Sequence, residues 1–156
     1  MYINNVKFAK NNQRQTGKVD LTKLSRVQEI DSYSGELNFE LIGLVDKLNR
    51  PTLNLRIYGI IHTLCQNCLQ PMDVQIDNTS GITVFYTEEQ LDAALFGDAS
   101  SGVEDGVLAE EEFDVMQLVE DEVIMLLPYA TKHEKCIGMS YADKAENPFE
   151  VLKNII

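Results

Sequence analysis

The sequence predicts an α+β protein with an antiparallel β-sheet, open or curled into a partial barrel, and flanking helices. Apolar and polar residues alternate from Gly35 to Cys65, which is typical of half-buried strands. Turn-forming residues interrupt that alternation at 49–51, so two strands can fold back on each other. After Tyr86 the apolar residues instead recur at helical spacing behind capping residues.

The N-terminal half of the chain predicts one short helix and a hairpin. Asp20 precedes apolar residues at helical spacing over 21–27, and its carboxylate can accept a hydrogen bond from a free amide at the helix start. Apolar residues then occupy alternate positions over 37–45 and again over 53–65. The short turn between these stretches predicts two antiparallel strands.

The middle of the chain predicts more strand material and a helix. Apolar residues at 74–76 and 82–86 indicate extended structure, with a turn expected over 78–81, where Asn, Ser and Gly gather. The sheet should therefore have at least three or four strands. Thr87 is followed three residues later by Gln, a capping arrangement that predicts a helix over 88–95.

The C-terminal part predicts a loop and two further helices. Residues 97–106 are small, polar and acidic, as in a mobile acidic loop. Asp114 begins a second capping arrangement, and the helix that follows should end before Pro128. A third helix start lies at 147–150, where a proline takes the first helical position. The face that the helix after Asp114 should bury consists of Met116, Val119, Val123 and Leu126.

Length and composition indicate one globular domain over 1–156. The chain is 44% hydrophobic, which is enough for a core and excludes disorder throughout. No apolar run approaches the roughly 20 residues that cross a bilayer, and residues 1–7 lack the apolar stretch of a secretory signal. We therefore expect a cytoplasmic protein without a membrane span.

The charges are distributed unevenly. The formal net charge is −12, and fifteen Asp and Glu residues but no Lys or Arg lie between Arg56 and Lys132. Such an acidic surface attracts basic proteins and repels phosphate, although carboxylates also serve solubility alone. The first 26 residues are basic and could form a short arm that contacts nucleic acid. Its cations are Lys7, Lys10, Arg14, Lys18, Lys23 and Arg26.

Three cysteines and a histidine are candidate metal ligands. Cys65 and Cys68 are spaced so that a tight turn brings both sulfurs to one metal ion. His133 and Cys136 supply a second pair, and the four together would form a structural zinc site. Buried thiols without a ligand role are one alternative. A redox pair is a weaker one, because Pro71 and an extended pattern follow instead of a helix.

The sequence contains no motif of an enzyme, since it lacks a Gly-rich phosphate loop, a serine nucleophile elbow and an HExxH segment. Glu120, Asp121 and Glu122 follow one another on a predicted helix, so their side chains diverge by about 100° and are expected to form a solvated face. His62 is expected to be a structural histidine on a strand. We predict no catalytic residues and a protein that is not an enzyme.

Four segments together are similar to a known family. They are Cys65 to Pro71, Leu118 to Pro128, His133 with Cys136, and Asn147 to Leu152. In this order and approximate spacing they resemble the YceD family, the large ribosomal RNA subunit accumulation proteins, and the resemblance covers about two thirds of the chain.

The chain departs from that family pattern at two positions. Asn67 stands where the family usually has arginine, and Thr131 stands where a second proline is usual. The second departure is expected to loosen the loop that leads to His133.

The resemblance implies one YceD-like domain over 1–156 that acts in the bacterial cytoplasm in the synthesis, processing or stability of large-subunit ribosomal RNA, without catalysis. Together with the charge distribution, it suggests a basic ribosomal protein or an assembly intermediate of the large ribosomal subunit as the partner. Any direct rRNA contact should use the six N-terminal cations. The alternatives are a cytosolic thiol oxidoreductase using Cys65 and Cys68, and an acidic inhibitor or nucleic-acid mimic without a ribosomal role.

Overall fold

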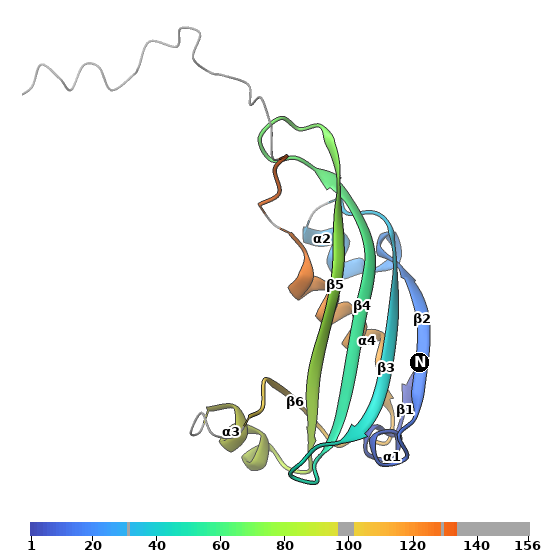
Figure 1. The fold of residues 1–156 in the computed structure, drawn as a ribbon, viewed down its shortest axis with the longest axis vertical. Helices are drawn as coiled ribbons and strands as arrows, with labels where there is room; N and C mark the ends of the chain where they lie inside the picture. The colour runs from blue at the N-terminus through green and yellow to red at the C-terminus, as the bar shows by residue number, and fades with distance from the viewer. Residues whose placement is uncertain (31, 97–101, 129, 134–156) are drawn as a thin grey trace, which may run out of the picture.

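The computed structural model describes residues 1–30, 32–96, 102–128 and 130–133 (Figure 1). Within them, five strands form one sheet in the order β2-β3-β4-β5-β6, and β1 pairs with β7 in a second, two-stranded sheet. The larger sheet does not close into a barrel, so the predicted α+β class is confirmed in its open form.

The elements are, in chain order, β1 (Tyr2–Ile3), α1 (Asn5–Lys10), β2 (Arg14–Asp20), the 3₁₀ turn η1 (Leu21–Lys23), α2 (Ser25–Ile30), β3 (Glu36–Val45), β4 (Pro51–Leu64), β5 (Pro71–Phe85), α3 (Glu88–Phe96), β6 (Asp105–Leu108), β7 (Phe113–Asp114) and α4 (Val115–Leu126).

Strands β3, β4 and β5 form an antiparallel meander, and its first two strands are the predicted hairpin. β3 pairs with β4 along its length, with Leu41 opposite Leu55, and the turn between them is held by the Asp46 carboxylate. That carboxylate accepts hydrogen bonds from the amides of Leu48 and Arg50 at 2.9 and 2.8 Å. β5 is the longest strand, at 15 residues. The hairpin predicted from alternation is therefore confirmed.

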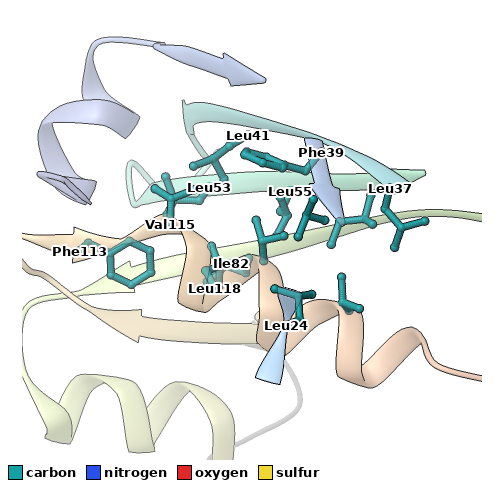
Figure 2. Packing of buried hydrophobic residues seen from close by; sticks show 14 of the residues in the cluster. Leu24, Leu37, Phe39, Leu41, Leu53, Leu55, Ile82, Phe113, Val115 and Leu118 are labelled. Carbon is teal, nitrogen blue, oxygen red and sulfur yellow. The ribbon is translucent and has the colours of Figure 1, made fainter. Parts of the chain in front are cut away.

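The core lies on one face of the sheet, beneath α4 (Figure 2). Asp114 caps α4 by accepting a hydrogen bond from the Met116 amide at 2.9 Å, as predicted. The buried face differs from the predicted one by about one residue, because Met116 and Leu126 are only partly buried. The residues of α4 that are buried are Val115, Leu118, Val119 and Val123.

The turn predicted over 78–81 is wrong, because β5 continues through these residues opposite β4. Ser80 lies opposite Leu55 and Asn78 opposite Ile57. Both polar side chains hydrogen-bond to Glu122 on α4. A long neighbouring strand and a partner on the covering helix thus override a local composition that is typical of turns.

The N-terminal residues are folded into the domain and do not form a separate arm. Helix α1 crosses the sheet at Gly43, where a Cβ atom would lie 2.3 Å from the Phe8 carbonyl oxygen. β2 pairs with β3 over seven residues, and the helix predicted over 21–27 is divided into η1 and α2. The strand was missed because Arg14–Asp20 buries only Val19 and has no apolar alternation.

Some expectations lie partly or wholly outside the described residues. These are the helix from 147 onward and the first half of the loop over 97–106, whose last residues, Asp105 and Gly106, instead begin β6. The helix predicted over 88–95 is confirmed as α3. Among the described residues, no helix combines the length and the apolar composition needed to cross a membrane.

Candidate metal centre

The candidate metal centre lies in the loop between β4 and β5, at the end of the sheet far from α3 (Figure 1). The loop comprises residues 65–70. The Cys65 amide donates to the Gln70 carbonyl oxygen at 2.9 Å, and the Leu69 amide donates to the Cys65 carbonyl oxygen at the same distance. Leu69 has a φ of 56°, so the chain reverses tightly and brings Cys68 back toward Cys65.

The Cys65 side chain is fully buried where β4 ends. Burial raises the pKa of its thiol, but hydrogen bonds to the sulfur lower it overall, from 9.0 to about 6. The donors are the backbone amides of Cys68, Asn67 and His133, together with the Cys68 side chain. At neutral pH this environment favours the thiolate, which is the form of cysteine that binds metal ions.

His133 reaches the loop from the segment that follows α4. Its Nδ1 lies 3.4 Å from Cys68 Sγ, although the two residues are 65 positions apart in the sequence. Thr131 holds this segment in place: its carbonyl oxygen accepts from the Gln66 amide at 2.8 Å, and its hydroxyl donates to the Leu64 carbonyl oxygen at 3.2 Å. A proline at 131 has no hydroxyl group and could not make the second bond. Thr131 therefore fixes this loop to β4, whereas the sequence analysis expected threonine at this position to loosen it.

Three of the four predicted ligands are therefore brought together. One ligand atom each from Cys65, Cys68 and His133 lies within 4.8 Å of the others, whereas Cys136 lies outside the described residues. Two sulfurs and one imidazole nitrogen are ligands that zinc prefers. The two cysteines do not point apart as separate core side chains.

The six N-terminal cations are exposed, and they are divided between different places: Lys18, Lys23 and Arg26 line one hollow, whereas Lys7 and Lys10 line another. Lys18 pairs with Glu36 at 2.6 Å, Arg14 pairs with Glu40, and Arg26 pairs with Asp121. Lys10 lies over the Tyr86 ring, 5.8 Å from its centroid. Lys7 and Lys23 make no ion pair with a described carboxylate. Half of the predicted nucleic-acid contacts thus already have acidic partners within the domain.

The opposite end of the sheet carries a group of carboxylates that we call the acidic end. β6 pairs in parallel with the last residues of β5, and Leu91 of α3 packs against Gly106 of β6. The buried Asn5 side chain holds the next loop by bonding to Leu108 and Glu110. These contacts gather the exposed residues Glu88, Glu89, Asp92, Glu104, Asp105, Glu110, Glu111 and Glu112.

None of these eight carboxylates makes an ion pair within the described parts of the chain. Lys7 and Lys10 line the same hollow of about 350 Å³ as Glu110 and Glu111, without contact at ion-pair distance. The sequence showed the excess of acid in this region, but only the β5–β6 pairing shows that the acidic residues gather at one end.

The carboxylates of α4, in contrast, have partners. Glu120 accepts a hydrogen bond from the Arg26 amide, and Asp121 forms an ion pair with the Arg26 guanidinium. Glu122 accepts a hydrogen bond from the Ser80 hydroxyl on β5. They diverge as predicted, but they are half-buried rather than a solvated face. On the outer face of the sheet, His62 Nδ1 lies 2.6 Å from Oδ1 of Asp73, which is opposite it on β5.

The protein is a small α+β protein with an open, mostly antiparallel sheet. Its candidate sites lie at the two ends of that sheet, the cysteine loop at one and the acidic end at the other. The chain belongs to the YceD family: residues 53–155 match the family described as large ribosomal RNA subunit accumulation protein YceD. This confirms the resemblance drawn from the four segments. No curated protein and no solved structure matches the chain.

The matched range contains the cysteine loop, His133 and the acidic end. It begins within β4 and leaves out β1, β2 and β3. The N-terminal cations lie on elements outside this range.

Proposed function

We propose that this protein supports the synthesis, processing or stability of large-subunit ribosomal RNA in the bacterial cytoplasm, by binding rather than by catalysis. The observation that carries the proposal is the match of residues 53–155 to the YceD family, whose description names accumulation of that RNA. The description names no reaction, so the mode of action is argued from charge and burial.

The acidic end favours a basic protein as the direct partner. Elsewhere on the surface, several acidic side chains pair with cations of the chain itself: Asp77, for example, accepts two hydrogen bonds from Arg56, both at 2.8 Å. Eight exposed carboxylates without such partners in the described ranges repel one another, and an external cationic surface would relieve that repulsion. A basic ribosomal protein, free or within an assembly intermediate of the large subunit, fits this requirement.

Direct rRNA contact is a second candidate, supported by the exposure of the N-terminal cations. Phosphates would have to compete with Glu40, Glu36 and Asp121 for three of them. Lys7, Lys10 and Lys23 make no ion pair with a described carboxylate, so they should carry most of any contact. Neutralising these three should weaken binding to purified rRNA more than neutralising Arg14, Lys18 and Arg26.

Burial argues against a thiol oxidoreductase. A redox CxxC pair needs an accessible nucleophilic sulfur, usually at a helix N-terminus. Here Cys65, whose thiol pKa is lowered to about 6, is fully buried, and the loop leads into β5 rather than into a helix. The cysteine loop is better suited to holding structure than to exchanging disulfides.

The test uses bacterial cells that lack the gene for this chain and carry a replacement copy. The variant Glu88→Gln, Glu89→Gln, Asp92→Asn neutralises three carboxylates of α3. The matched control Glu29→Gln, Glu36→Gln, Asp73→Asn removes the same charge away from the acidic end. Both are compared for large-subunit RNA level and for co-sedimentation with large-subunit precursors at low and high salt.

We expect the α3 variant to co-sediment several-fold less than the control, and the unmodified protein to dissociate as salt screens the contact. Equal behaviour of the variant and the control would overturn the role of the acidic end. Normal levels of large-subunit RNA in cells without the gene would overturn the ribosomal role itself.

A further inference from the structure

We propose that Cys65, Cys68 and His133 bind one Zn²⁺ ion, which clamps the segment after α4 onto the loop between β4 and β5. This inference is independent of the proposed ribosomal role, because it rests on the geometry of three side chains.

The first argument is the spacing of the ligand atoms. In a tetrahedral zinc site with sulfur at about 2.3 Å and imidazole nitrogen at about 2.0 Å, a sulfur and a nitrogen are about 3.5 Å apart and two sulfurs about 3.8 Å apart. Cys68 Sγ and His133 Nδ1 are 3.4 Å apart, and all three ligand atoms lie within 4.8 Å of one another. Small side-chain rotations would bring them around one ion.

The second argument is that this cluster stands apart from other groups of possible ligands, both in its spacing and in its ligand types. Among the described residues, no other group of three His, Cys, Asp or Glu side chains brings its ligand atoms this close, although the chain has 25 acidic residues. Two thiolates and an imidazole with no carboxylate favour zinc over magnesium or calcium, which prefer oxygen ligands.

The third argument is the support around the cysteines. Backbone amides point at the Cys65 sulfur from both the loop and the His133 segment, and hydrogen bonds of this kind orient the ligands of a metal site. Cys65 is buried and Cys68 half-buried, so solvent has limited access to the sulfurs. A site that is preformed in this way loses little conformational entropy on binding an ion.

The fourth argument is that the ion would attach residues 130–133, which follow α4, to the loop between β4 and β5. Within the described residues, the segment 130–133 reaches the rest of the domain through Thr131, which bonds to Gln66 and Leu64, and through the contacts of His133. An ion shared by His133 and the cysteines would join positions 65 residues apart. Zinc should therefore fix the path of the chain beyond α4 and stabilise the folded state.

The primary test is elemental analysis of the full chain purified without chelator. About one zinc per chain is expected. Cys68→Ser and His133→Gln should each weaken zinc binding at least about tenfold. His62→Gln is the matched control, because His62 is the other histidine of the chain and lies outside the cluster. Co²⁺ in place of zinc should show thiolate charge-transfer absorption in the control and lose part of it in Cys68→Ser.

Three results would overturn the proposal: no zinc in the unmodified chain, unchanged affinity in Cys68→Ser, or equal losses in His62→Gln and His133→Gln. A Cys65–Cys68 disulfide in zinc-free protein purified under reducing conditions would also count against it.

A second measurement avoids variants that fail to fold. Hydrogen exchange is followed in the unmodified chain before and after zinc is added to chelator-treated protein. The Gln66 amide, which bonds to Thr131, should exchange at least about tenfold more slowly with zinc. The Asn49 amide, which bonds to Asp46 at the other end of β4, should not change. An unchanged rate at Gln66 with zinc bound would overturn the clamp.

Discussion

The Ser80 hydroxyl on β5 donates a hydrogen bond to Glu122 on α4, and this contact ties the middle of the longest strand to the helix that covers the core. Asn78 donates to the same carboxylate oxygen at 3.3 Å and to Ser80 Oγ at 3.0 Å. Because these polar side chains are satisfied, residues that usually form turns can remain in a strand.

Replacing Glu122 tests this contact. Glu122→Ala leaves Ser80 and Asn78 half-buried without their acceptor, so the free energy of unfolding should fall by about 1–2 kcal/mol. Glu112→Ala is the control, since Glu112 is exposed and makes no ion pair with a described residue; its effect should stay within about 0.5 kcal/mol. Urea unfolding measures both values. Equal losses in the two variants would show that the Glu122 contact does not support the strand.

The central hairpin could be predicted because its pattern is local. Leu37, Phe39 and Leu41 are buried at alternate positions, and Leu53, Leu55 and Ile57 repeat this on β4. β2 could not be predicted, because an edge strand held by pairing and by ion pairs such as Lys18–Glu36 needs no apolar pattern. The buried face of α4 differs from the predicted face by about one residue, because the sheet that the helix covers also determines which of its side chains face inward.

The candidate sites were predictable to different degrees. The cysteine pair is visible in the sequence because its spacing is local, whereas the approach of His133 depends on the path of the chain after α4. The acidic end required the parallel pairing of β6 with β5, for which the four residues of β6 give no sequence pattern. The approach of His133 and the gathering of the acidic end therefore depend on long-range contacts, which local propensity does not encode.

The crossing of α1 over β3 depends on Gly43. A Cβ atom there would lie 2.3 Å from the Phe8 carbonyl oxygen and 2.7 Å from Ala9 Cα, both backbone atoms that cannot move alone. Gly43→Ala should therefore displace α1 and lower the free energy of unfolding by about 1–3 kcal/mol. Gly81→Ala is the matched control, because its nearest neighbour would be Asn54 Oδ1 at 3.7 Å. Thermal unfolding compares the two, and similar midpoints would contradict the close approach of α1.

The cap of α4 predicts a pH dependence of stability. Burial raises the pKa of the Asp114 carboxyl, but hydrogen bonds from the Met116 amide and the N-terminal ammonium group lower it overall, below its ordinary value of 3.8. Since the pKa is lower in the folded than in the unfolded state, the stabilisation is complete above the ordinary value and is lost as pH falls through the folded value.

Asp114→Asn keeps a capping side chain but removes the charge. At neutral pH it should be less stable than the unmodified chain by about 0.3–1 kcal/mol, and the difference should shrink as pH falls below 3.8. Unfolding titrations between neutral and acid pH measure the difference. Acetylation of the N-terminus should reduce it, because the ammonium contact at 3.2 Å is lost. A difference in stability between the two proteins that does not vary with pH would show that the Asp114 charge is not its cause.

The fourth position of the zinc site provides the last prediction. Cys136 follows His133 by three residues, and the sequence analysis expects it to complete the ligand set. If it does, Cys136→Ser should weaken zinc binding by more than about tenfold while Cys65, Cys68 and His133 still hold the ion, with water in the open position. Cobalt substitution should then show weaker thiolate absorption, as expected for two sulfur ligands instead of three.

Lys135→Ser is the control for Cys136→Ser, because it places the same residue in the same segment without removing a ligand type. It should bind zinc like the unmodified chain. Equal affinity in Cys136→Ser would show that another group fills the fourth position, and the three-residue site would stand without Cys136. A loss in Lys135→Ser as large as that in Cys136→Ser would instead mean that the path of the segment, and not the third thiolate, controls the affinity.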